Sequence, residues 1–101
     1  MRKKEKRLLL IVALDYEFEA GITYILRTLQ EERISHAIEY HEIGYVEINI
    51  YLPINSIVTK DKRGLTIKWR DSKDETDNLN HFIITNRMLL EMSMSEVTKI
   101  D

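Results

Sequence analysis

The chain has 101 residues, no cysteine, 44% hydrophobic residues and a formal net charge of −2. This length fits one domain, predicted to span residues 1–101 with a basic tail at residues 1–6, and the hydrophobic content is that of a folded chain. Lack of cysteine excludes disulfides, thiolate nucleophiles and cysteine-based zinc sites. The small net charge argues against a polyanion binder that acts through its overall field.

The first apolar run, Leu8–Leu14, follows several basic residues, as the core of a signal peptide does. The run is too short to cross a bilayer, and it ends at Asp15 rather than at a small-residue cleavage site. We therefore expect a cytoplasmic protein without membrane contact.

The same run predicts a strand at residues 7–14, and the segment after it predicts a helix that ends near Arg33. Asp15 suits the N-cap of this helix, because its carboxylate can accept from the free amides of the first turn. Gly21 within this predicted helix indicates either that another backbone approaches closely at this position or that the helix simply tolerates a glycine there. Apolar residues recur every three or four positions and share one stripe: Phe18, Ile22, Ile25, Leu26 and Leu29.

The apolar period then changes from 3.6 to 2. Residues 36–43 and 45–52 predict strands, the second with apolar side chains on one face and polar side chains on the other. Residues 57–60 and 65–70 predict a hairpin, in which Gly64 is free to adopt positive φ.

The last third fits two patterns. Leu79, Phe82, Ile83, Asn86, Leu89 and Leu90 lie on one helical stripe, whereas Met88, Leu90, Met92 and Met94 alternate as in a strand. A helix over residues 74–92 is preferred. It gives an α+β fold, an antiparallel sheet with two helices packed on one face, in the order strand, helix, strands, helix. The alternative is a ferredoxin-like order with a final strand at residues 88–94.

No catalytic, cofactor or metal site is predicted, and we expect the chain not to be an enzyme. His36 and His41 are five residues apart, which places them on opposite faces of a regular strand, with no third ligand at a useful spacing. Glu39 and Glu47 could lie beside each other on neighbouring strands, but charged residues are expected on the outer face of an antiparallel sheet.

Two kinds of surface are expected to bind partners. The apolar residues of the two predicted helices exceed what so small a domain can cover, so another chain is expected to cover them: Ile22, Ile25, Leu26, Leu89, Leu90 and Met92. Two basic patches are candidates for contact with nucleic-acid phosphates: Lys3, Lys4, Arg7, Lys60, Lys62 and Arg63.

Two segments resemble the small dimerisation subunit of the KEOPS complex, which makes threonylcarbamoyladenosine in tRNA. EAGITYILRTLQEE at Glu19–Glu32 is similar to the first helix of that family, and TNRMLLEMSMSEVTKI at Thr85–Ile100 is similar to its closing amphipathic helix and tail. The matching residues are Glu19, Ala20, Ile22, Tyr24 and Leu29 in the first segment and Asn86, Leu89, Met92, Glu96 and Val97 in the second.

The resemblance implies a non-catalytic small subunit or adaptor of a tRNA-modification complex. Its helices would dock to a larger catalytic subunit, its sheet would pair with a second copy or a paralogue, and its basic patches would contact tRNA. Two alternatives remain open at this point. One is an independent RNA- or DNA-binding protein that uses the basic patches, and the other is a viral or mobile-element inhibitor that occludes a larger enzyme.

Overall fold

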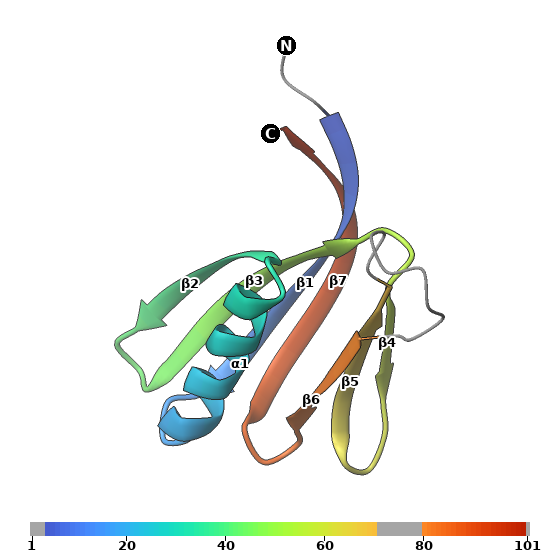
Figure 1. Cartoon of the computed structure of the whole chain (residues 1–101). Coiled ribbons are helices and arrows are strands. Elements are labelled where there is room, and N and C mark those ends of the chain that lie inside the picture. The colour runs from blue at the N-terminus through green and yellow to red at the C-terminus, as the bar shows by residue number, and fades with distance from the viewer. Residues whose placement is uncertain (1–3, 71–79, 101) are drawn as a thin grey trace.

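One helix and seven strands make up the part of the chain that the computed structural model describes, residues 4–70 and 80–100 (Figure 1). The elements, in chain order, are β1 (Lys4–Asp15), α1 (Glu19–Glu31), β2 (Ser35–His41), β3 (Tyr45–Pro53), β4 (Ile57–Lys60), β5 (Gly64–Trp69), β6 (Asn80–Thr85) and β7 (Leu89–Ile100). The strands form two antiparallel sheets. We call the first, ordered β2-β3-β1-β7, the large sheet, and the second, ordered β4-β5-β6, the small sheet.

In the large sheet, β3 lies between β1 and β2, which are joined through α1. This is a split β-α-β arrangement. The alternation of apolar and polar residues along each strand fixes the register of pairing, because a slip of one residue would turn every apolar side chain of a strand to the other face. Ile48 of β3 pairs with Val12 of β1 and with Ile38 of β2, so the three apolar side chains form one row across the sheet.

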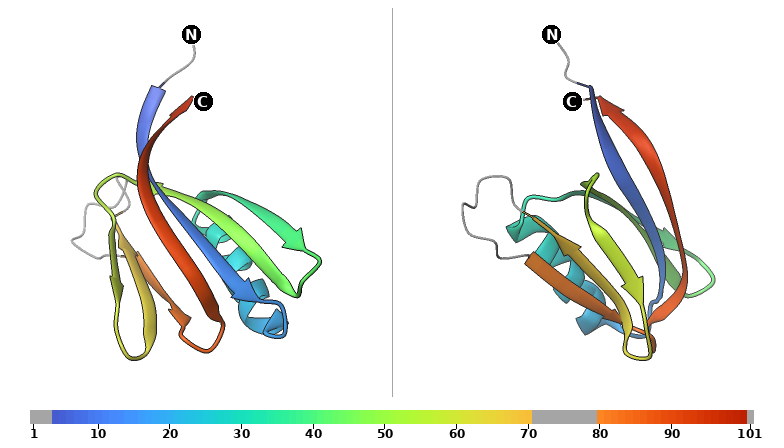
Figure 2. Two further views of the ribbon diagram at one scale, coloured as in Figure 1. Left: turned by 180° about the vertical axis from the view of Figure 1, so that it is seen from behind. Right: turned by 90° about the vertical axis from the view of Figure 1, so that its right-hand side faces the viewer.

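The core lies on the face of the large sheet that α1 and the small sheet cover (Figure 2). Buried residues of β1, β3 and α1 join those of the small sheet in a single hydrophobic cluster. Trp69 of β5 and Phe82 of β6 meet edge to face there, with ring centroids 5.6 Å apart. The small sheet and the helix therefore cover the same side of the large sheet. We call the opposite side of the large sheet, which neither of them covers, the outer face.

The predicted second helix is wrong, and with it both predicted layouts, because each requires that helix. The described part of residues 74–92 forms β6, a turn and the start of β7, while residues 74–79 lie outside the described ranges. In β6, Phe82 and Ile84 are buried while His81, Ile83 and Thr85 are exposed, which is the period of a strand. The chain is mostly β, and the small sheet stands where the second helix was expected. Residues Thr85–Ile100, compared above with the closing helix of the KEOPS subunit, consequently lie mainly in a strand.

Several smaller predictions can also be compared with the structure. The helix begins at Glu19 rather than after Asp15, because residues 15–18 form a turn in which Asp15 Oδ1 accepts from the Glu17 amide at 3.0 Å. The positive φ of Gly64 is confirmed, at +147°. At Gly21 the close neighbour is a side chain rather than a backbone, since an added Cβ would lie 2.8 Å from Met88 Sδ. No helix in the described ranges is long and apolar enough to cross a membrane.

Candidate functional site

The outer face of the large sheet carries the polar side chains that alternate with the core. On β3 these are Tyr45, Glu47, Asn49 and Tyr51, and each is half-buried. Lys99 of β7 reaches across this face: its Nζ donates to Ser35 Oγ at 2.9 Å and lies 5.5 Å from the Tyr51 ring centroid. Because Ser35 and Lys99 belong to the two opposite edge strands, this contact shows that the sheet is strongly curved and that the outer face is concave at that end.

Nearer the β2–β3 turn, the outer face holds Glu39, His41 and Glu47, which we call the Glu-His-Glu cluster. Glu39 and Glu47 are register partners on β2 and β3, and His41 lies two residues beyond Glu39 on the same face. One ligand atom from each side chain lies within 4.8 Å of the other two. The His41 ring stacks on Tyr45 of the neighbouring strand, with centroids 4.4 Å apart and planes 10° apart, and this contact fixes its orientation.

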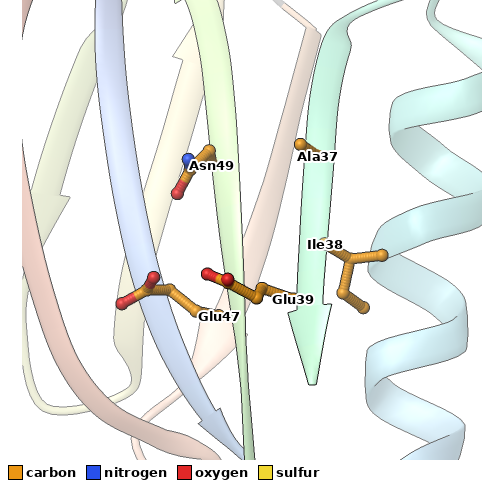
Figure 3. A pocket seen from close by; sticks show the side chains of 5 residues that line it. All are labelled: Ala37, Ile38, Glu39, Glu47 and Asn49. Carbon is orange, nitrogen blue, oxygen red and sulfur yellow. The ribbon is translucent and has the colours of Figure 1, made fainter. Parts of the chain in front are cut away.

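The members of this cluster differ in exposure, since the His41 side chain is 30% exposed and that of Glu39 is 73% exposed. His41 Nε2 is shielded from solvent and has no hydrogen-bond partner, and its distance to Glu39 Oε2 is 3.8 Å. A shallow hollow of about 270 Å³ adjoins the cluster. It is lined by Ala37, Ile38, Glu39, Glu47 and Asn49. In Figure 3 the Glu39 carboxylate reaches from β2 over β3 towards the Glu47 side chain. The arrangement gathers two carboxylates and one imidazole nitrogen around a common point.

The predicted partner-binding residues fall into two groups. Ile22 and Ile25 are 5% and 1% exposed, so the core of the chain itself covers the apolar stripe of α1. Leu26, Leu89 and Met92 are half-buried against the same core, whereas Leu90 is 56% exposed. Of the six predicted residues, only Leu90, on β7, is therefore exposed. Met94 and Ile100, on the same strand, are also exposed and were not among the predicted residues.

The predicted nucleic-acid residues do not form one surface. Lys4 is exposed at the start of β1, Arg7 forms an ion pair with Glu5, and Lys3 lies outside the described residues. Lys60 at the end of β4 is exposed, as are Lys62 and Arg63 in the β4–β5 turn. Figure 1 places this turn and the start of β1 at opposite ends of the molecule. A single basic groove of the kind that holds a nucleic-acid backbone is not formed by these residues.

Sequence reasoning considered Glu39 beside Glu47 but missed His41 as their neighbour, because it compared His41 only with His36. The missing signal is the register of the hairpin. In an antiparallel pair the residue numbers of partners add to a constant, so pairing His41 with Tyr45 also pairs Glu39 with Glu47.

Comparison of the chain with protein-family models, with curated proteins and with solved structures gives no match. The site is therefore interpreted from its own geometry.

Proposed function

We propose that this protein is a non-catalytic, cytoplasmic interaction subunit that forms a homodimer by strand pairing at β7. β7 has 12 residues and lies at the edge of the large sheet, where, among the described residues, it pairs only with β1. The unpaired amides and carbonyls of such an edge are a template for another strand. β2, at the opposite edge, has 7 residues. The long free edge of β7 is the observation that carries the proposal.

A second copy fits this edge because the sequence of β7 is complementary to itself. Antiparallel pairing about a two-fold axis at Ser95 places Glu91 of each copy opposite Lys99 of the other. The same register brings the ends of the two strands together, where Ile100 and the bulge residue Leu90 are 54% and 56% exposed in the single chain. Dimerisation would thus bury apolar area and form two cross-strand ion pairs.

Other registers fit less well. An axis at Glu96 would place the two Glu96 side chains opposite each other, which is unfavourable. A register that places Glu96 opposite Lys99 would pair the two strands only from Ser95 onwards. It would leave half of each β7 edge unpaired. Lys99 donates to Ser35 of β2 within its own chain, on the side of β7 away from a partner strand, so pairing with Glu91 requires its side chain to turn from Ser35 to the free edge.

Docking to a larger catalytic subunit and a part in tRNA modification stay predictions of the KEOPS resemblance. The roles of independent nucleic-acid binder and of inhibitor protein likewise stay predictions. Docking through the helix would have to use its exposed side chains, such as Tyr24 at 60% exposure, because Ile22 and Ile25 are buried.

The test is the oligomeric state of charge-reversal variants, measured by light scattering coupled to size-exclusion chromatography. We expect a dimer at high micromolar concentration. Glu91→Lys and Lys99→Glu should each weaken it about 10-fold or more, because two attractive pairs become repulsive. The double variant should dimerise again. Glu96→Lys makes the same charge change opposite Met94, away from the pair, and serves as the control.

A monomeric parent protein would contradict the proposal. So would equal effects of Glu91→Lys and Glu96→Lys, or a double variant no better at dimerising than the single ones. Circular dichroism of each variant establishes that a loss of dimer is not a loss of fold.

A further inference from the structure

We propose that Glu39, His41 and Glu47 bind one divalent transition-metal ion, with Zn²⁺ as the best fit, on the outer face of the large sheet. The first support is electrostatic. Glu39 and Glu47 are direct cross-strand partners, and like charges in that position are unfavourable. A cation held between the carboxylates converts this repulsion into attraction.

The second support is the state of the imidazole. His41 Nε2 is shielded from solvent without a hydrogen-bond partner, and a buried polar atom of this kind calls for a partner such as an ion. A proton on Nε2 would not give this atom a hydrogen-bond partner in Glu39, because the distance from Nε2 to Glu39 Oε2, 3.8 Å, is beyond hydrogen-bond range. Stacking on Tyr45 holds the ring in its plane, as a ligand imidazole needs to be held.

Distances and donor types point to the same class of ion. Two ligand atoms bonded to one zinc ion at about 2.1 Å each lie at most about 4.2 Å apart. The three ligand atoms are within 4.8 Å of one another, so small side-chain rotations bring them into range. One nitrogen and two carboxylate oxygens suit Zn²⁺ or a neighbouring d-block ion better than Mg²⁺ or Ca²⁺, which prefer oxygen ligands alone.

The site would leave at least one coordination position for water, since the protein supplies three ligands. Asn49 lines the adjoining hollow on the same face and is placed to hydrogen-bond such a water. The ion would also tie edge strand β2 to β3 next to their turn, so binding should stabilise the folded chain.

Titration calorimetry of the full chain with Zn²⁺ tests the site. We expect one ion per chain and an affinity lowered about 10-fold or more in Glu39→Gln, His41→Gln and Glu47→Gln. His36→Gln and Glu42→Gln are the matched controls, because they remove the same groups from outside the cluster, and their affinity should stay within about 2-fold of the parent. Mg²⁺ and Ca²⁺ should not compete at equal concentration.

Thermal melting supplies a second readout that binding to scattered surface histidines would not produce. In chelator, Glu47→Gln should melt higher than the parent, because it removes the like-charge pair. With excess Zn²⁺ the order should reverse. Absence of zinc binding at millimolar concentration, an equal loss in His36→Gln and His41→Gln, or an unchanged order of melting temperatures would overturn the proposal.

Discussion

Gly64 occupies a position where the small sheet leaves no room for a side chain, and Gly64→Ala should separate two of its strands. The residue has φ +147°, and a Cβ added to it would lie 2.1 Å from the carbonyl oxygen of Ile84 and 2.8 Å from the Cα of Thr85. Thr85 is the register partner of Gly64 on β6. The atoms in the way are therefore backbone atoms of a paired strand, which cannot rotate aside as a side chain can.

The expected loss has two parts. Placing alanine at a positive φ costs about 1–3 kcal/mol. Moving β6 away adds the loss of nearby backbone hydrogen bonds, at about 1 kcal/mol each, including the bond from the Asn86 amide to the Arg63 carbonyl. The sum is about 3–5 kcal/mol, a large share of the 5–15 kcal/mol by which domains are usually stable. Gly44→Ala isolates the first part, because Gly44 has φ +83° and an added Cβ there meets nothing within 4 Å.

Tryptophan fluorescence during urea unfolding measures the difference in unfolding free energy between the Gly64→Ala and Gly44→Ala variants. Trp69 is the single tryptophan of the chain, is 4% exposed and lies on β5 itself. We expect Gly64→Ala to lower the free energy of unfolding by about 2 kcal/mol more than Gly44→Ala. A Gly64→Ala chain that is unfolded without urea, beside a folded Gly44→Ala chain, agrees with the reasoning. Equal losses in the two variants would refute it.

Two further substitutions test the loops and the helix. Asn86→Ala removes the hydrogen bonds from Nδ2 to the carbonyls of Asp61 and Lys62, at 3.0 and 2.9 Å. It should lower the free energy of unfolding by about 1–2 kcal/mol in the same urea titration. No loss would mean that these bonds do not hold the turns together. Gly21→Ala gains about 1 kcal/mol of helix propensity but must displace Met88 Sδ. It should therefore stabilise a Met88→Leu background more than the parent, and equal effects in the two backgrounds would contradict the contact.

The strand at Tyr45–Pro53 was predictable because its pattern admits one interpretation. Its residues alternate between apolar and polar, and the four apolar side chains are fully buried in the structure. The β4–β5 hairpin was predictable for a similar reason, since its turn needs a residue that tolerates positive φ and Gly64 provides it. Local pattern and tertiary structure agree at both places.

The last third was not predictable from local pattern, because its apolar residues satisfy periods of both 3.6 and 2. Phe82 belongs to the predicted helical stripe, yet in β6 its ring meets Trp69 of β5. The pairing of β6 with β5, which a single segment does not encode, decides between the two periods. The Glu-His-Glu cluster was missed for a related reason: the strand was predicted to continue to Ile43, and without its true end at His41 the hairpin register could not be fixed.

The two proposals concern opposite edges of one sheet, and this makes them separable by experiment. The metal ligands lie on β2 and β3, whereas the dimer contacts lie on β7, with β1 between β3 and β7. Glu47 and Glu91 pair with Ala13 of β1 from its two sides, so they lie two strands apart, at about 9.5 Å, and substitutions there should couple only weakly. Glu47→Gln should therefore leave the dimer intact, and Glu91→Lys should change zinc affinity far less than Glu47→Gln does. If Glu91→Lys lowered zinc affinity as much as Glu47→Gln, the ion would instead depend on the assembled dimer, and the cluster within one chain would not be sufficient to bind it.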